Sequence, residues 1–131
     1  MILIPDASAL MAWVMPDETG PDLDAALAAG DSVVAPWLLW VELRNILLVS
    51  ERRGRLPAGM AEQILEPLEA LGIVLDIAPS AQLVMDLARR HGLSAYDSLY
   101  LECALRQGGV LASCDRALLR AAAAEGVETL G

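Results

Sequence analysis

Two aspartates stand where an apolar run of the sequence gives way to a helical one. Asp6 follows ILIP and precedes SALMAWVM, and Asp115 follows VLASC and precedes RALLRAAAA. An aspartate in this position commonly caps the N-terminus of the following helix. An N-cap also faces the edge where strands end, so each residue could cap its helix and bind a ligand there. Both carboxylates are therefore candidate site residues as well as candidate caps.

Two further acids lie inside expected helices. Glu42 belongs to WLLWVELRNILLV, where it forms a polar notch with Asn45, or alternatively a solvated stripe beside Arg44. Asp97 stands three residues after Ser94, at the third position of a helix, where a carboxylate can close a capping box. The alternative for Asp97 is that its carboxylate points toward the same strand ends as Asp6.

Four carboxylates in these positions favour chemistry that depends on a bound cation. Carboxylates that converge on one place repel each other unless a cation neutralises them. Hard oxygen ligands select Mg²⁺ or Mn²⁺ over Zn²⁺. A pair of such ions about 3.5–4 Å apart is one established arrangement for hydrolysing phosphodiesters, and it requires no lysine, histidine or covalent nucleophile.

The elements that must position these acids alternate along the chain. Short apolar runs predict strands, and the segments between them have helical periodicity. Such alternation predicts an α/β fold whose mainly parallel sheet is covered by helices on both faces. We expect strands at 2–5, 32–35, 73–77, 110–114 and 127–130. We expect helices at 8–15, 21–30, 37–53, 57–72 (with Pro57 in its first turn), 80–90, 94–107 and 115–125.

The composition indicates one domain over residues 1–131 without a membrane segment. Hydrophobic residues make up 56% of the chain, yet a charged residue interrupts every long apolar run. A membrane-spanning helix needs roughly 20 apolar residues in a row. The N-terminal apolar run lacks a basic start and contains Asp6, which argues against a signal peptide. We therefore expect a cytoplasmic protein whose apolar residues fill a sheet covered on both faces and contact a partner.

The charge and the missing lysine exclude several functions. The net charge is −9, and all nine basic residues are arginines. This balance argues against binding nucleic acid through bulk positive charge. A P-loop NTPase needs a lysine, and a serine hydrolase of the GxSxG type needs a motif that is absent. Haloacid-dehalogenase-type phosphatases and receiver domains also usually use a lysine, and the first expects Asp-x-Asp where this chain has Asp6-Ala7-Ser8.

The cysteines and tryptophans predict structural roles. Cys103 and Cys114 lack the spacing of a zinc site, so we expect two reduced and mostly buried thiols. We interpret Trp13, Trp37 and Trp40 as residues of the core or of a dimer interface rather than as platforms for stacking bases.

The acidic segments together resemble a known family. PDASALMAW at 5–13, VELRNIL at 41–47, SAYDSLYLECAL at 94–105 and LASCDRALL at 111–119 resemble the four acidic motifs of PIN domains. VapC toxins of bacterial toxin–antitoxin pairs are the most similar group, and the resemblance extends over nearly the whole chain. Each motif alone is unspecific, but the set in this order is specific.

The resemblance implies a three-layer α/β/α sandwich around a roughly five-stranded sheet and an Mg²⁺-dependent endoribonuclease. Asp6, Glu42, Asp97 and Asp115 match the acidic set of the family and would bind Mg²⁺, or Mn²⁺ in its place. Three polar residues match positions that are usually polar in the family and would support the acids. Ser113 is one of them and stands where the family often has threonine. An arginine beside Asp115 is, by its position, a candidate contact for a phosphate. These four residues are Ser113, Ser8, Asn45 and Arg116.

The resemblance also implies partners. VapC-like proteins act on RNA, typically form homodimers and are inhibited by a small VapB-like antitoxin. Two alternatives stay open at this stage: a catalytically silent PIN-like binding or regulatory module, and a Mg²⁺ phosphatase with an aspartate at a strand end. A silent member is expected to have lost at least one of the acids, and here all four positions are filled.

Overall fold

The computed structural model describes residues 1–131 and contains five strands and seven helices. The strands are β1 (Ile2–Pro5), β2 (Ser32–Pro36), β3 (Val74–Asp76), β4 (Val110–Ala112) and β5 (Thr129–Leu130). The helices are α1 (Ala7–Val14), α2 (Leu23–Ala28), α3 (Leu39–Arg52), α4 (Met60–Glu69), α5 (Ala81–His91), α6 (Ala95–Gln107) and α7 (Arg116–Ala124). The predicted order of elements is confirmed, with ends that differ by a few residues.

The five strands form one parallel sheet in the order β3-β2-β1-β4-β5. β1 is central, because the chain leaves it to build β2 and β3 on one side and returns to build β4 and β5 on the other. Strand order therefore reverses beside β1, and in open α/β sheets ligands bind at such a reversal, outside the carboxyl ends of the strands. The backbone N–H of Asp6 donates to Ala112 O at 2.9 Å, which continues the ladder between β1 and β4 to this edge.

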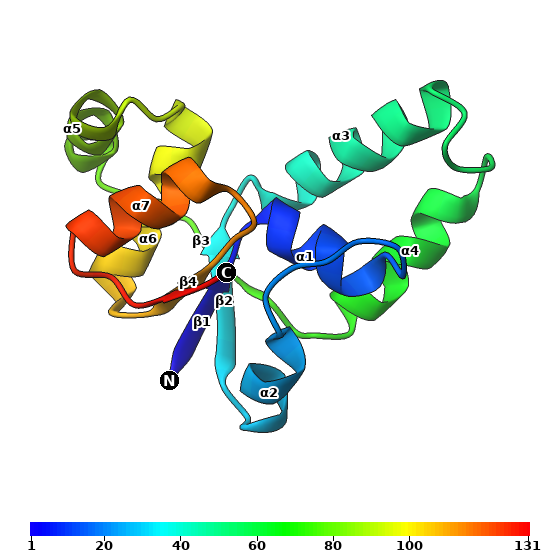
Figure 1. Ribbon diagram of the computed structural model, residues 1–131, viewed down its shortest axis with the longest axis horizontal. Helices are drawn as coiled ribbons and strands as arrows, with labels where there is room; N and C mark the ends of the chain where they lie inside the picture. Colours follow the sequence, from blue (N-terminus) through cyan, green and yellow to red (C-terminus); the bar gives the residue numbers. More distant parts are fainter.

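Helices cover both faces of the sheet and complete the three-layer sandwich (Figure 1). α1, α3 and α4 pack against one another on one face, and α5, α6 and α7 pack together on the other. α6 lies directly on β1, β2 and β4. One continuous apolar core joins the layers and contains residues from both groups of helices, among them Leu10, Leu43 and Leu101.

Two expectations about single residues are wrong. Pro57 is not in the first turn of a helix, because α4 begins at Met60 after Gly59, whose φ of 87° interrupts helical backbone geometry. The Met60 N–H instead donates to Pro57 O at 3.2 Å in the preceding turn. Cys114 is exposed, because β4 ends at Ala112 and the thiol lies in the loop that follows, whereas Cys103 is buried as expected.

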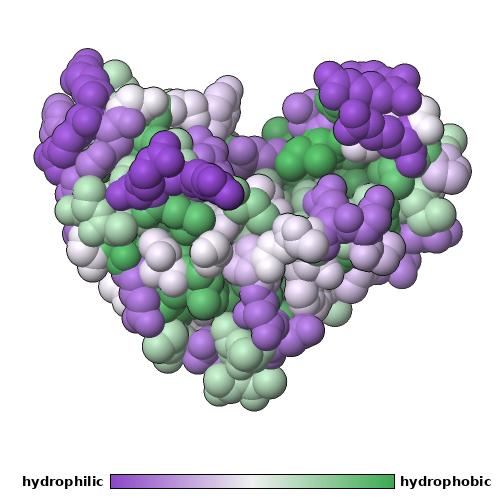
Figure 2. All heavy atoms as spheres, viewed as in Figure 1, coloured by the Kyte–Doolittle hydropathy of each residue, from purple (hydrophilic) through white to green (hydrophobic).

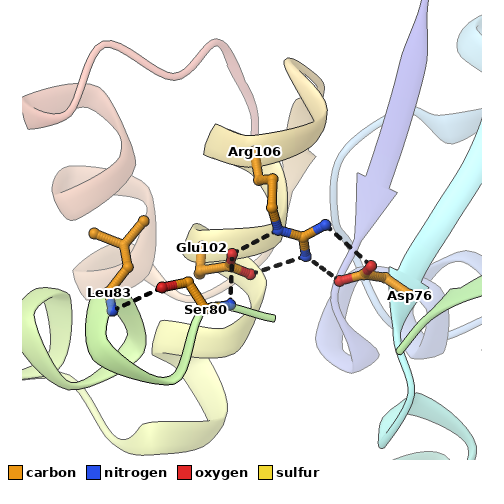
Figure 3. A network of polar contacts seen from close by, with 5 residues as sticks. All are labelled: Asp76, Ser80, Leu83, Glu102 and Arg106. Atoms are coloured by element: carbon orange, nitrogen blue, oxygen red, sulfur yellow. Dashed lines mark hydrogen bonds and ion pairs between the residues drawn. The ribbon is translucent and has the colours of Figure 1, made fainter. Parts of the chain in front are cut away.

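A charged network ties the edge strand β3 to the helices of one face (Figure 3). Arg106 of α6 donates to Glu102 Oε1 at 2.7 Å and forms an ion pair with Asp76 at the end of β3. Glu102 is fully buried and also accepts from the Ser80 N–H at 3.1 Å, at the start of α5. These contacts hold β3, α5 and α6 together away from the acidic residues at the end of β1.

The helices of the structure are 6 to 14 residues long. None of them is both long enough and apolar enough to cross a membrane.

Candidate active site

Asp6 is held rigidly at the carboxyl end of the central strand. Its Oδ1 accepts from the Ala9 N–H at 2.9 Å, so it caps α1 as the sequence predicts. The same oxygen accepts from the Ser8 hydroxyl at 2.6 Å, and Oδ2 accepts from the Ser113 hydroxyl at 2.5 Å. Only 5% of the residue is exposed. The carboxylate is therefore fixed by three hydrogen bonds from two strand ends.

Ser113 connects Asp6 to the end of β4. It is fully buried, and its hydroxyl oxygen accepts from the Asp115 N–H at 2.9 Å while its proton goes to Asp6. Ser8 extends the connection, because its oxygen accepts from the Cys114 N–H at 3.0 Å. The expectation that both serines support the acidic set agrees with these contacts, which join the strand ends of β1 and β4.

Glu42 projects from the first turn of α3 and lies half-buried against α6. Its Oε1 accepts from the Tyr100 hydroxyl at 2.7 Å, which rules out the alternative of a solvated stripe beside Arg44. Burial raises the pKa of this carboxyl above its usual value, the hydrogen bond from Tyr100 lowers it, and the charges of Asp6 and Asp97 raise it further. Glu42 thus lies within electrostatic range of two other acids.

Asp97 and Asp115 stand at the N-termini of α6 and α7. Asp115 caps α7 by accepting from the Ala117 and Leu118 N–H groups at 2.9 and 3.2 Å. The Asp97 N–H donates to Ser94 Oγ at 3.1 Å, as the capping interpretation predicts. Burial raises the pKa of Asp97, and the negative charges of Asp115 and Asp6 raise it as well.

The four acids form one electrostatic group without a basic partner. None of the four makes an ion pair with an arginine, with His91 or with the N-terminus. Burial is the largest cause of the raised pKa values of Glu42 and Asp97, and the like charges of the neighbouring acids raise these values further. A bound cation would remove this repulsion, and the oxygen donors fit a hard divalent ion.

The donors fit an ion that keeps part of its water shell better than one enclosed by protein. No three His, Cys, Asp or Glu side chains are arranged to ligate one ion directly. Mg²⁺ usually retains several waters and takes only one or two carboxylates from the protein. Asp6 and Asp115, already fixed by hydrogen bonds, are the two acids whose oxygens would be preorganised for such an ion.

The other two supporting candidates lie outside the hydrogen-bonded group. Asn45 is exposed on α3, one turn beyond Glu42, and its side chain makes no hydrogen bond within the chain. Arg116 is exposed at the start of α7 and lines a separate hollow with Ser113 and Cys114. Both are adjacent to the acids without contacting them.

Sequence reasoning missed Tyr100. It is 1% exposed, and its hydroxyl is the only side-chain donor to Glu42. Tyr100 stands three residues after Asp97, a spacing that places both on one side of α6. That spacing was the available signal, but the partner 58 residues away could come only from the fold.

Comparisons with known proteins agree with this architecture. A family model described as the PIN domain matches residues 3–124. Ribonuclease VapC3 from Pyrobaculum aerophilum is 32% identical over 121 residues, which cover 90% of this chain and 92% of that protein. Among solved structures, PAE2754 from the same organism has a TM-score of 0.77 at 26% identity and covers 98% of this chain and 92% of its own. FitAcB from Neisseria gonorrhoeae has a TM-score of 0.65 at 22% identity, covers 100% of this chain and 97% of its own, and supports the fold alone.

Proposed function

The chain belongs to the PIN-domain family, and from this premise we propose that it is a divalent-metal-dependent endoribonuclease of the VapC type. The proposed reaction is hydrolysis of an RNA phosphodiester bond by water. The observation that carries the proposal is the group of four acids at the strand-order reversal, without a basic partner among them. The similarity to Ribonuclease VapC3 over most of both chains supports the choice of RNA as substrate.

In the proposed reaction, the side chains of this protein provide oxygen ligands for the metal and keep them oriented. Asp6 and Asp115 are oriented by helix-capping hydrogen bonds, and Ser113 connects the two. Tyr100 orients Glu42 toward the group. When bound, Mg²⁺, or Mn²⁺ in its place, would lower the pKa of the attacking water and stabilise charge on the phosphate.

We also propose the biological setting that the VapC similarity suggests. The protein would act as the toxin of a type II toxin–antitoxin pair, form a homodimer and be inhibited by a VapB-like antitoxin. Exposed apolar side chains on α3 support a protein partner, because Ile46 is 38% exposed and Leu48 is 44% exposed. Growth arrest on expression, relieved by co-expression of the cognate antitoxin, is the expected result in a bacterial host.

The decisive experiment is cleavage of end-labelled total RNA by purified, antitoxin-free protein in Mg²⁺ or Mn²⁺. The wild type should give discrete products that EDTA abolishes. Asp97→Asn should lower the rate about 100-fold or more, because it removes one negative oxygen from the acidic group, while electrostatic contacts of this kind commonly supply 10²–10³ in rate. Asp17→Asn, the same change at an exposed turn, is the matched control and should cut like the wild type.

Two results would contradict the proposal. If the wild type and Asp97→Asn give the same products at the same rate, the cleavage comes from a contaminant. If neither folded protein cuts RNA with either metal, the chain is better described as a binding module that retains the fold.

A further inference from the structure

A hollow with aromatic walls adjoins the acidic group. It has a volume of about 500 Å³, within the range of small-molecule sites, and lies between the start of α3 and the start of α6. The residues that line it are Trp37, Leu38, Val41, Glu42, Asn45 and Tyr96. Glu42 belongs both to this hollow and to the acidic group, and Tyr96 immediately precedes Asp97. A molecule in the hollow would therefore be adjacent to the carboxylates.

The two aromatic side chains are exposed although their backbones are fixed. Trp37 is 53% exposed and Tyr96 is 62% exposed. The Trp37 N–H donates to Asp76 O at 3.0 Å, which anchors the residue to the neighbouring strand β3. Tyr96 lies in the first turn of α6, whose capping by Ser94 fixes its start. Leu38, which is 5% exposed, provides a buried apolar floor.

The hollow lies where the two groups of helices separate at the carboxyl edge of the sheet. α3 and α6 diverge from the carboxyl edge of the sheet on opposite sides of the molecule (Figure 1). The space-filling view has a heart-shaped outline, with a notch between the lobe of α5, α6 and α7 and the lobe of α3 and α4 (Figure 2). The hollow itself is open to solvent, since both of its aromatic side chains are more than half exposed.

The charges around the hollow favour a nucleobase over a phosphate as its occupant. No arginine lines the hollow, and its one acid is Glu42, so an anionic group is disfavoured there. A neutral base is not disfavoured, because stacking on an aromatic face needs no positive charge. The Asn45 amide is exposed, free of internal hydrogen bonds and able to donate and accept, as the edge of a base requires.

Resting on the proposed ribonuclease function, we propose that this hollow is a nucleobase subsite in which Trp37 and Tyr96 stack an unpaired base of the RNA. Asn45 contacts the edge of that base, and the adjoining phosphodiester lies at the acidic group. This subsite explains how a chain with a net charge of −9 can hold RNA with few phosphate contacts. It also makes single-stranded or looped RNA the preferred substrate class, since a paired base is not free to enter. Because Trp37 is 53% exposed, the expectation that it lies in the core is wrong, and the proposed subsite is an alternative to its expected place in a dimer interface.

The test titrates the protein with AMP, GMP, CMP and UMP and follows tryptophan emission. At least one nucleotide should quench the emission saturably, whereas ribose 5-phosphate, with the same phosphate and no base, should not. Trp37→Phe should remove the quench although Trp13 and Trp40 remain. Tyr96→Ala should weaken binding at least about fivefold, as expected for one lost aromatic face. Ile77→Ala, at an exposed apolar position outside the hollow, is the control and should leave binding unchanged.

A mononucleotide has no bond for the enzyme to cut, so the titration is independent of the proposed activity. Quenching without RNA cleavage would support the subsite and contradict the ribonuclease, and cleavage without quenching would do the reverse. An unchanged quench in Trp37→Phe, or an equal response to ribose 5-phosphate, would overturn the subsite.

A second copy of the chain is the competing occupant of this face. Light scattering on the wild type and on Val41→Glu tests it, because a charge at this exposed position would disrupt an interface across the hollow. A dimer that becomes a monomer in Val41→Glu, with no response of the wild type to nucleotides, would assign the face to dimerisation. An unchanged mass together with the nucleotide response supports the subsite.

Discussion

Asp6 illustrates how one residue can cap a helix and serve a site at the same time. Its Oδ1 accepts from Ala9 N–H and from Ser8, yet Oδ2 is bound only by the Ser113 hydroxyl. The sequence identified the positions of Asp6 and Asp115 because capping is a local property of a strand–helix junction. It could not identify the contact between Ser113 and Asp6, which are 107 residues apart, or that between Tyr100 and Glu42. Such contacts depend on the register of the finished sheet and on where the starts of α3 and α6 meet at its edge.

Substitutions of Ser113 should distinguish its role in positioning Asp6 from a role in folding. Ser113→Ala removes the hydroxyl that fixes Asp6, and we expect RNA cleavage to fall about 10- to 100-fold, the usual effect of losing a residue that orients a metal ligand. Ser113→Thr keeps the hydroxyl and should retain most of the activity, so it is the matched control. Initial rates at saturating Mg²⁺ measure the effect, and circular dichroism verifies folding. Equal rates for the two variants would show that the hydroxyl does not position Asp6 for the reaction.

At the scale of elements, alternation of apolar and helical segments was sufficient to predict the sheet and its helices. The start of α4 was misplaced because a proline and a left-handed glycine compete as signals, and Gly59 decides where the helix begins. The network of Asp76, Glu102 and Arg106 was not predicted, since its members come from β3 and α6 and meet only after packing. The network joins β3 to the C-terminal half of α6, which carries Glu102 and Arg106.

Removal of Arg106 should destabilise the fold without altering the acidic group. Arg106→Met leaves the fully buried Glu102 and the nearly buried Asp76 without a counter-ion. Breaking such a pair commonly costs 3–5 kcal/mol, and because a third of the Arg106 side chain is exposed we expect about 3 kcal/mol. Urea unfolding measures the loss, with Arg120→Met on the exposed side of α7 as the control. A change below about 0.5 kcal/mol would mean that water already screens the network.

The contact between α5 and α7 should make stability depend on pH. Hydrogen bonds from Arg90 and His91 lower the pKa of Glu125, at 2.7 to 2.9 Å and 2.6 Å respectively. The lowered pKa means that the contact stabilises the fold above the ordinary glutamate pKa of about 4.3 and is lost as the pH falls through the lowered value.

Glu125→Gln should therefore have a lower urea midpoint than the wild type at pH 7, and the two midpoints should converge below about pH 4. Glu128→Gln, an exposed glutamate without a side-chain hydrogen bond, is the control and should follow the wild type at every pH. A midpoint difference that persists unchanged at low pH would assign the effect to packing rather than to charge.

At the scale of the whole molecule, one apolar core connects both helical layers through the sheet. We therefore predict that residues 1–131 unfold as one domain. Far-ultraviolet circular dichroism, which reports helices from both layers, and the emission of Trp13, Trp37 and Trp40 should give coincident thermal transitions. Two separated transitions would show that the layer of α1, α3 and α4 unfolds independently of α5, α6 and α7.

The pairing of β1 with β4 also determines when the site can exist. Asp6 is synthesised 107 residues before Ser113, which with Asp115 completes its surroundings. Contacts between such distant residues form slowly, and domains generally fold as units during synthesis. A nascent chain without β4 cannot assemble the acidic group. The site can therefore form only after the chain has been synthesised as far as Asp115 and β4 has paired with β1.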